Sequence, residues 1–377
     1  MAANRGEWAE LYVFFKLLGD GRIYTADDNL NRNPNSYLNI LRIIREEIRA
    51  QIIEYNVTEN AIIIITLPGE DPIEVQANQF LINAENLLHV IQNQTGRTFE
   101  ATEEINTFMQ LVRVSRIKAP SMAYNNMLGG KNDIIMEVYD HTTALSTIAG
   151  FSIKSNYKSP ATLFNAAKAS SFVYRLSGMN DERMTEVNSL FNARGNKDKT
   201  ARISYCINNR INFNFYGVRI LAGNDYSIFS DNLQNVRGDM KMILNHALLI
   251  HYFELRNSSK LSDITNKLIE ENPLRVRRPD IYYKKAIKDF LYAAFAGLTA
   301  SEVWDGVARV NGGYIVAKDD GEVLVYHTRD GESFRTFLFN NTKIDRPDAS
   351  ENRCDYAHVY KIGNEYYFDL NFQIRFI

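Results

Sequence analysis

The amino-acid sequence predicts an α+β fold with a β-rich C-terminal region, because three patterns follow one another along the chain. Helical periodicity dominates the first third, and two strand-like runs with helical and mixed segments make up the middle. Helical patterns return between residues 240 and 305, and short strand patterns broken by glycine-containing turns follow to the end. This order of elements indicates α+β, or an α/β core followed by a β-rich part.

The composition is that of an ordinary globular protein, long enough for two domains. Of the 377 residues, 45% are apolar and 23% are charged, and the net charge of −2 gives no general indication of nucleic-acid binding. Cys206 and Cys354 have no metal-binding spacing and are read as reduced thiols. The sequence has neither an apolar run of membrane-spanning length nor a signal peptide's apolar segment. We therefore expect a cytoplasmic protein without membrane contact.

The elements of the first half follow from their periodicity. Apolar side chains recur at helical spacing from residue 8 to residue 18, and Gly19-Asp20-Gly21 ends this first helix. A helix is expected over residues 36–53 and a pair of strands over residues 55–77. Two more helices are expected over residues 77–92 and 103–114. Two strand-like runs over residues 132–155 come next.

The second half begins with residues 159–176, whose Ser-Pro start and helix-forming continuation predict a helix. One or two strands are expected over residues 201–220. Helices are then expected over residues 239–255, 261–272 and 286–298. Strands are expected over residues 312–328 and 358–377. We expect a core region over residues 1–240 and a helical, then β-rich, region over residues 241–377.

The two strand-like runs in the middle of the chain carry the clearest chemical pattern. Alternate side chains of a strand share a face, so Asp133 lies on the side of Glu137, and Ser152 shares a face with Lys154. If the two runs pair as a hairpin, Asp133 and Lys154 lie near the same end. A carboxylate, with a main-chain carbonyl such as that of Ile153, can hold Mg²⁺, while the lysine contacts a phosphate.

Two interpretations of this pattern remain open. An Asp–Lys pair that flanks a hairpin commonly forms a solvated salt bridge. A metal-dependent phosphodiesterase would use the same pair, with the lysine orienting or deprotonating the attacking water. The first helix bears on this choice, because Glu7 lies inside its apolar arc and Glu10 at the margin. A first-turn position, where acidic side chains favour the helix dipole, explains Glu7 well and Glu10 less well.

Four segments of the chain resemble a known family. They read NRGEWAELYVFFKLLGDGRIYTADDNLN (4–31), GFSIKSNYKSPATLFNAAKASSFVYRL (150–176), LTASEVWDGVARVNGGYIVAKDDGEVLVYH (298–327) and YFDLNFQIRFI (367–377). Together they are similar to the HpaII-type restriction endonucleases. The resemblance implies a PD-(D/E)XK nuclease core, with a mixed sheet flanked by helices, that cleaves duplex DNA with Mg²⁺ at a short palindromic, CCGG-like site. It also implies a DNA methyltransferase as functional counterpart.

The resemblance assigns roles to the residues of the hairpin. Asp133 matches the catalytic aspartate of the motif and Lys154 its lysine, whereas Ser152 stands where most of the superfamily has Asp or Glu. The second carboxylate is therefore expected from elsewhere in the chain. Glu10, from the first helix, is the first candidate for this metal ligand, and Glu137 is the second.

DNA recognition is expected mainly in the C-terminal half, by residues of a homodimer that matches the palindrome. Arg353 and Lys343 are candidates for reading guanine, since Arg and Lys donate hydrogen bonds to its O6 and N7. Asn165, in the segment after Lys154, is a further DNA-binding candidate. Contacts to phosphates are expected from a basic run that comprises Arg275, Arg277 and Arg278.

Two other functions are weighed against a restriction endonuclease. One is a structure-selective repair or resolvase-type nuclease of the same superfamily, which the large β-rich extension disfavours. The other is a non-catalytic DNA-binding relative, which the intact pair of Asp133 and Lys154 disfavours.

Overall fold

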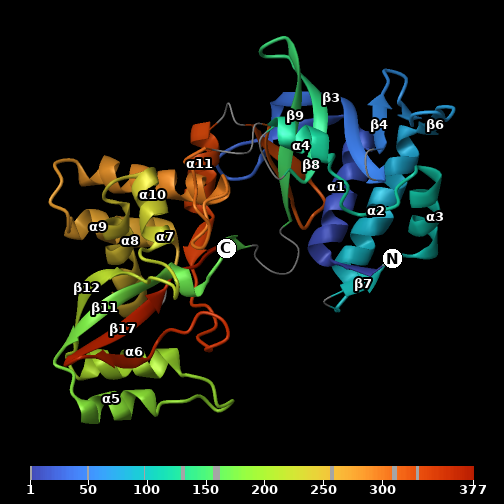
Figure 1. The fold of residues 1–377 in the computed structure, drawn as a ribbon. Helices are drawn as coiled ribbons and strands as arrows, with labels where there is room; N and C mark the ends of the chain where they lie inside the picture. The colour runs from blue at the N-terminus through green and yellow to red at the C-terminus, as the bar shows by residue number, and fades with distance from the viewer. Residues whose placement is uncertain are drawn as a thin grey trace. The chain divides into compact units, whose positions relative to one another are not determined.

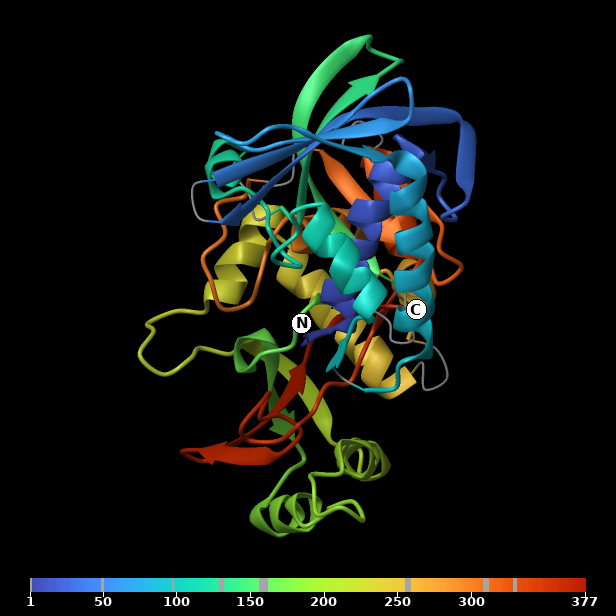
Figure 2. The ribbon, with the colours of Figure 1, turned by 90° about the vertical axis from the view of Figure 1, so that its right-hand side faces the viewer.

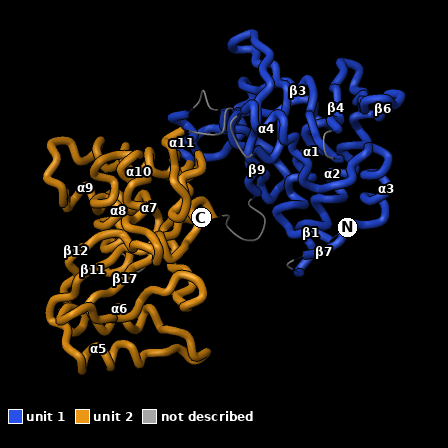
Figure 3. The backbone as a smooth tube through the Cα atoms, in the orientation of Figure 1, with its two compact units in different colours: residues 1–161, 309–337 blue, residues 162–308, 338–377 orange. Residues whose placement is uncertain are grey.

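The computed structural model describes residues 2–48, 51–96, 98–128, 132–155, 162–254, 259–307, 312–327 and 331–377. The chain divides into two compact units (Figure 3): unit 1 comprises residues 1–161 and 309–337, and unit 2 comprises residues 162–308 and 338–377. The boundary predicted at residue 240 falls inside unit 2, which begins at residue 162, and residues 309–337 return to unit 1. The mixed α+β class is confirmed by the helices and sheets of the described residues.

Unit 1 is built on a large mixed sheet. Its strand order is β2 (Arg22–Ala26), β14 (Val323–His327), β13 (Gly313–Ala317), β9 (Leu145–Ser155), β8 (Ile134–Asp140), β3 (Arg32–Ile48), β4 (Gln51–Val57), β5 (Ile62–Thr66) and β6 (Ile73–Gln76). Neighbours are antiparallel except for two parallel pairs, β9 with β13 and β14 with β2. Because β2 also pairs with β3, the first six of these strands form a closed ring of pairings.

Helix α1 (Arg5–Asp20) packs at the centre of the unit 1 core (Figures 1 and 2). It is buried on nearly every side, from Trp8 to Leu18, against the sheet and against α2 (Ala77–Asn93). Helix α3 (Glu103–Leu111) adds Ile105 and Phe108 to the same core. The helices predicted near these three positions are confirmed. Two further short elements, β1 (Ala2–Asn4) and β7 (Thr98–Glu100), pair with each other.

The helix predicted over residues 36–53 is wrong, because this segment forms strands β3 and β4. A register shift in β3, between Ile40 and Arg42, explains the misleading pattern. The shift leaves Leu41 exposed and puts Ile40 and Ile43 into the same core, so their three-residue spacing imitates a helix. The strands predicted over residues 55–77 and 132–155 are confirmed.

Unit 2 contains two small sheets. One has the order β12 (Asn212–Val218), β11 (Ser171–Ser177), β17 (Glu365–Asn371) and β16 (Val359–Ile362), and the other has β10 (Thr162–Phe164), β18 (Ile374–Phe376) and β15 (Thr342–Ile344). Figure 1 shows two groups of helices on opposite sides of the four-stranded sheet. One group is α7 (Ile228–Val236), α8 (Met240–Leu249), α9 (Leu261–Glu271) and α10 (Pro279–Phe295), and the other is α5 (Asp181–Asn188) and α6 (Lys199–Asn208).

Unit 2 corrects two sequence predictions. The helix expected over residues 159–176 is instead β10 and β11, with residues 156–161 outside the described ranges. The first part of the expected strand over residues 201–220 is α6, and the second part is β12. Helix α11 (Gly331–Asn340), which begins in unit 1 and ends in unit 2, was not expected. The predictions of helices over residues 239–298 and of strands after residue 358 are confirmed, and none of the described helices is long and apolar enough to span a bilayer.

Candidate active site

Asp133 lies at the start of the β8–β9 hairpin, beside the strand that carries Lys154. Its N–H donates to the carbonyl of Phe151 at 2.9 Å. Its carboxylate oxygen Oδ2 accepts hydrogen bonds from the hydroxyl of Ser152 at 2.9 Å and from the N–H of Ile153 at 2.8 Å. The antiparallel pairing of β8 and β9 therefore brings Asp133, Ser152, Ile153 and Lys154 to one end of the hairpin, as the period of two predicts.

A buried amide next to Asp133 explains why residue 150 is glycine. The side chain of Asn132 lies over Gly150, where an added Cβ would be only 2.1 Å from the Cγ atom of Asn132. The Asn132 amide donates to Oδ1 of Asn125, in helix α4 (Met122–Leu128), at 2.8 Å. The absence of a side chain at position 150 thus leaves room for the side chain of Asn132, whose hydrogen bond to Asn125 anchors the chain just before Asp133.

Glu10 of α1 lies at the same end of the hairpin. Its side chain is 12% exposed, and its Oε1 lies 2.6 Å from Nζ of Lys118. Burial, followed by the negative charge of Asp133, raises the pKa of Glu10 to about 7, while Lys118 and Lys154 oppose the rise. Helix α1 therefore places Glu10 close enough to Asp133 and Lys154 for both charges to change its pKa.

Lys118 is a member of this cluster that the sequence prediction missed. It belongs to a loop that buried charges of β3 hold in place. One carboxylate oxygen of Glu47 accepts from the N–H groups of Ser115 at 2.8 Å and Arg116 at 2.9 Å, and Arg45 pairs with the other oxygen at 2.5 Å. Nothing in the local sequence distinguishes Lys118, because its position depends on contacts with residues about 70 positions earlier.

Glu137, the other candidate for the second carboxylate, takes part in a separate ion-pair network. The Nε atom of Arg42 lies 2.7 Å from Glu137, and Nη1 of Arg42 lies 2.8 Å from Glu54. Glu137 follows Asp133 by four residues, which is roughly 13 Å along a strand. The structure therefore groups Glu10, rather than Glu137, with Asp133 and Lys154.

Glu7 has a local structural role. Its carboxylate accepts from the N–H of Asn4 at 2.8 Å, and the side chain of Asn4 accepts from the N–H of Glu7 at 3.0 Å. This capping box at the start of α1 accounts for an acidic residue in the first turn.

The donor set at the hairpin suits a hard cation that keeps much of its hydration. Within the described ranges, no cluster of three or more His, Cys, Asp or Glu side chains is positioned to hold a metal ion. Mg²⁺ needs only one or two carboxylates, with waters and other oxygens completing its shell. Asp133 raises the pKa of Glu10, and this repulsion between two carboxylates is relieved by a cation between them. Asp133 and Glu10, with the carbonyl of Ile153, therefore fit Mg²⁺.

Two of the predicted DNA-binding residues lie together in unit 2. Arg353 and Asn165, which are distant in sequence, both line a polar pocket of about 680 Å³. Lys343, in β15, is paired with Arg375 of β18, and Arg375 lines the same pocket.

The three arginines of the predicted phosphate-binding run lie between α9 and α10, and all are exposed. Nη2 of Arg278 forms an ion pair with Asp280 at 3.1 Å. For Arg275 and Arg277, no ion pair is found within the described part of the chain. These two arginines are thus better placed than Arg278 to contact an external anion.

Comparison with known proteins is decisive for the family. The model of the HpaII restriction endonuclease family matches residues 4–376. The chain is also 33% identical, over 380 residues, to the Type II restriction enzyme HpaII of Haemophilus parainfluenzae, and the match covers 100% of this chain and 99% of that relative. No solved structure matches. The resemblance read from the sequence and the prediction of a site-specific deoxyribonuclease are thereby confirmed, and the chain belongs to the HpaII restriction endonuclease family.

Proposed function

We propose that this protein hydrolyses phosphodiester bonds of duplex DNA at a short palindromic site in a Mg²⁺-dependent reaction. The observation that carries the proposal is the convergence of Glu10 from α1 with Asp133, Ser152 and Lys154 of the hairpin. The whole-length relationship to a type II restriction enzyme supports it. A PD-(D/E)XK core is the arrangement that we infer for these residues.

Asp133 and Glu10 are the proposed metal ligands, with the carbonyl of Ile153 as a third donor. Both hydrogen bonds to the Asp133 carboxylate use Oδ2, which orients the group and leaves Oδ1 for a ligand. When bound, Mg²⁺ supplies positive charge that lowers the pKa of a water molecule and stabilises the negative charge on the reacting phosphate.

The two lysines of the cluster have different proposed roles: one contacts the substrate and the other holds a metal ligand. Lys154 contacts the scissile phosphate and orients or deprotonates the attacking water. Lys118, at 2.6 Å, holds Glu10 by an ion pair and offsets part of the cost of burying a carboxylate beside Asp133. Ser152 serves as the donor that fixes Asp133, which explains how a serine can occupy the position where an acidic residue is usual.

We assign recognition to unit 2, with a homodimer matching the two-fold symmetry of a palindromic, CCGG-like site. Arg353 and Lys343 are the proposed guanine readers, and Asn165 is a further contact. Arg275, Arg277 and Arg278 are proposed for phosphates. A DNA methyltransferase that protects the same site is the expected functional counterpart.

The test is incubation of the purified protein with phage DNA and Mg²⁺. Discrete fragments that disappear with a chelator are expected. Branch-specific cuts or smears would instead indicate a structure-selective nuclease, and binding without cleavage would indicate a non-catalytic relative. The Asp133→Ala variant is the control for contaminating nucleases, since it should produce no fragments.

The dimer is tested separately. We expect two subunits on one duplex that carries the site, measured as the mass of the complex in Ca²⁺. One subunit per site would contradict the dimer without affecting the catalytic assignment.

A further inference from the structure

The polar pocket of unit 2 has the size of a binding site. Its volume of about 680 Å³ lies within the roughly 300–1,000 Å³ that is typical of ligand pockets. Three separate parts of the chain line it, within residues 162–168, 345–354 and 373–375. A pocket assembled from such distant segments places several side chains around one point.

The pocket presents both hydrogen-bond donors and acceptors. Arg353 offers donors, Asn165 and Gln373 offer both kinds of group, and Asp348 offers acceptors. A phosphate group only accepts hydrogen bonds, so it would pair with the basic residues of the lining (Lys168, Arg346, Arg353 and Arg375) but leave Asp348 and the amide oxygens of Asn165 and Gln373 without a donor. The edges of bases in a duplex display donors and acceptors side by side, so this lining suits bases better than phosphates.

Gln373 is the most informative of these residues. It is 8% exposed and lines the pocket, yet its side-chain amide makes no hydrogen bond with any other described residue. Its carbonyl accepts from the N–H of Asp345 at 3.0 Å, which holds the residue in place. The amide atoms of Gln373 are not among the fully enclosed polar atoms that lack a partner, so they are accessible and can bond a ligand in the pocket.

Arg353 differs from the other arginines of the pocket in its surroundings. Arg375 lies 3.0 Å from Asp345, and Arg346 donates to the carbonyl of His251 at 3.2 Å. Arg353 is exposed, and its guanidinium has no ion pair or hydrogen bond within the part of the chain that the structure describes. Its donors are therefore available to a ligand.

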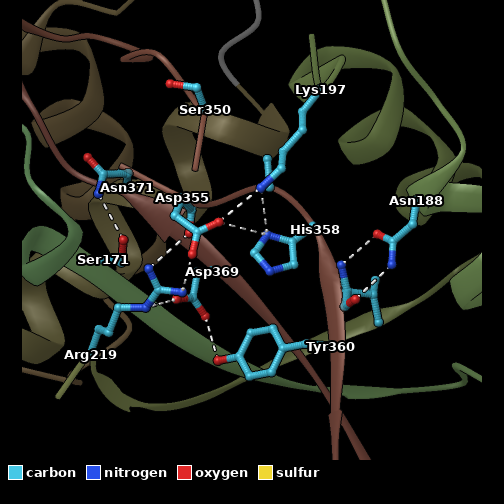
Figure 4. Close-up of polar contacts among 12 residues, drawn as sticks. Ser171, Asn188, Lys197, Arg219, Ser350, Asp355, His358, Tyr360, Asp369 and Asn371 are labelled. Atoms are coloured by element: carbon cyan, nitrogen blue, oxygen red, sulfur yellow. Dashed lines mark hydrogen bonds and ion pairs between the residues drawn. The ribbon is translucent and has the colours of Figure 1, made fainter. Parts of the chain in front are cut away.

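A polar network stabilises the segment that carries Arg353 (Figure 4). Asp355 lies 3.0 Å from Nζ of Lys197, and its carbonyl accepts from Arg219 at 2.9 Å. Arg219 in turn lies 2.9 Å from the buried Asp369 of β17. Lys199 donates to main-chain carbonyls at the start of the same segment. Such bracing lowers the entropy cost of binding and favours specificity.

We propose that this pocket reads the edge of a guanine-containing base pair, and that Gln373 and Arg353 are specificity-determining residues. Arg353 donates to O6 and N7 of guanine, and the amide of Gln373 bonds an adjacent base edge. This inference rests on the proposed function, since it requires a duplex as substrate.

The experiment measures binding in Ca²⁺ to two duplexes of equal length, one with a site that the wild-type protein cuts and one of random sequence. Arg353→Ala and Gln373→Leu should weaken specific binding about 10- to 100-fold and change random binding by less than about twofold. Replacing the guanines of the site by 7-deazaguanine, which lacks N7, should weaken the wild type but not Arg353→Ala. Arg194→Ala, which removes an exposed arginine outside the pocket, is the matched control and should change neither affinity.

The outcomes separate this inference from the function on which it rests. If the wild type cuts no discrete site, the proposed function fails. If it cuts a site and both variants bind the two duplexes as the wild type does, or lose both affinities equally, only the assignment of the pocket is overturned. Circular dichroism identifies a Gln373→Leu protein that does not fold, and the exposed Arg353 then still decides the question.

Discussion

Each unit of this protein buries a carboxyl group, and the two groups have different neighbours. Burial raises the pKa of Glu10 in unit 1 to about 7 and that of Asp369 in unit 2 to about 6. In unit 1 the charge of Asp133 raises the pKa of Glu10 further. In unit 2, Arg219 lies 2.9 Å from Asp369 and the hydroxyl of Tyr360 donates to it at 2.8 Å, and both lower its pKa. The charge of Asp355 raises this pKa by a smaller amount.

The comparison shows that a raised carboxyl pKa does not by itself identify a catalytic group. Asp369 is surrounded by partners that satisfy its charge, and these partners join strands and loops of unit 2. For Glu10 the largest effect of a neighbour is that of another carboxylate, Asp133, and Lys118 and Lys154 act against it. The sign of the strongest neighbouring charge, negative at Glu10 and positive at Asp369, therefore separates a candidate metal ligand from a structural residue.

The strongest test of this distinction removes the centre of the unit 1 cluster. Asp133→Ala and Lys154→Ala should each reduce the cleavage rate by at least about 10³-fold, because stabilisation of the phosphate charge is lost. Binding to specific DNA in Ca²⁺ should remain. A near wild-type rate in either variant, measured in single-turnover assays, would refute the assignment of the active site.

Glu10→Gln tests the comparison itself and should lower the Mg²⁺-dependent rate by about 10²-fold or more. Glu137→Gln is the matched control in unit 1, because Glu137 pairs with Arg42. Asp369→Asn is the control in unit 2 and should leave the Mg²⁺ dependence of the rate unchanged at saturating DNA, whatever it does to DNA binding. An inactive Glu137→Gln together with an active Glu10→Gln would show that the strand, and not the helix, supplies the second carboxylate.

Ser152→Ala should have a smaller effect on cleavage than the changes at Asp133 and Glu10. Its hydroxyl donates one neutral hydrogen bond to Asp133, and the N–H of Ile153 keeps the second. Loss of about 1 kcal/mol predicts a rate lower by roughly five- to tenfold. If single-turnover assays found this variant as inactive as Asp133→Ala, Ser152 would have a direct role in catalysis.

The fourth prediction concerns the pH dependence of stability, which a buried histidine of unit 2 should affect. Burial, and then the charge of Arg346, lowers the pKa of His251 to about 3. The unfolded chain takes up a proton below pH 6.5 and the folded chain does not, so this contribution to stability is complete above pH 6.5 and decreases as the pH falls toward 3. At pH 5 the wild type should lose roughly 2 kcal/mol of unfolding free energy through this residue.

Urea unfolding at pH 7.5 and pH 5 measures this loss. The decrease in unfolding free energy between the two pH values should be smaller in His251→Leu than in the wild type, by roughly 2 kcal/mol. The cleavage rate of the folded variant should not change, since His251 belongs to no proposed site. The same loss on acidification in both proteins would show that His251 is already protonated in the folded state.

Much of the hairpin and of α1 follows from local sequence. Alternation of side chains along a strand predicts that Asp133 and Lys154 meet at one end, because a hairpin pairs residues that are close in the chain. The apolar residues of α1 and its capping box likewise depend on neighbours within one or two turns.

What the sequence alone determined about this protein is thus its class, its first helix, its hairpin and its family. Only the tertiary structure decided that β3 is a strand, that Glu10 joins Asp133 while Glu137 pairs with Arg42, and that Lys118 completes the cluster. The pocket around Gln373 also depends on it. The physical reason is the same in each case: these features arise from contacts between residues far apart in the chain, and buried charges and amides choose their partners by proximity in space, which local periodicity does not encode.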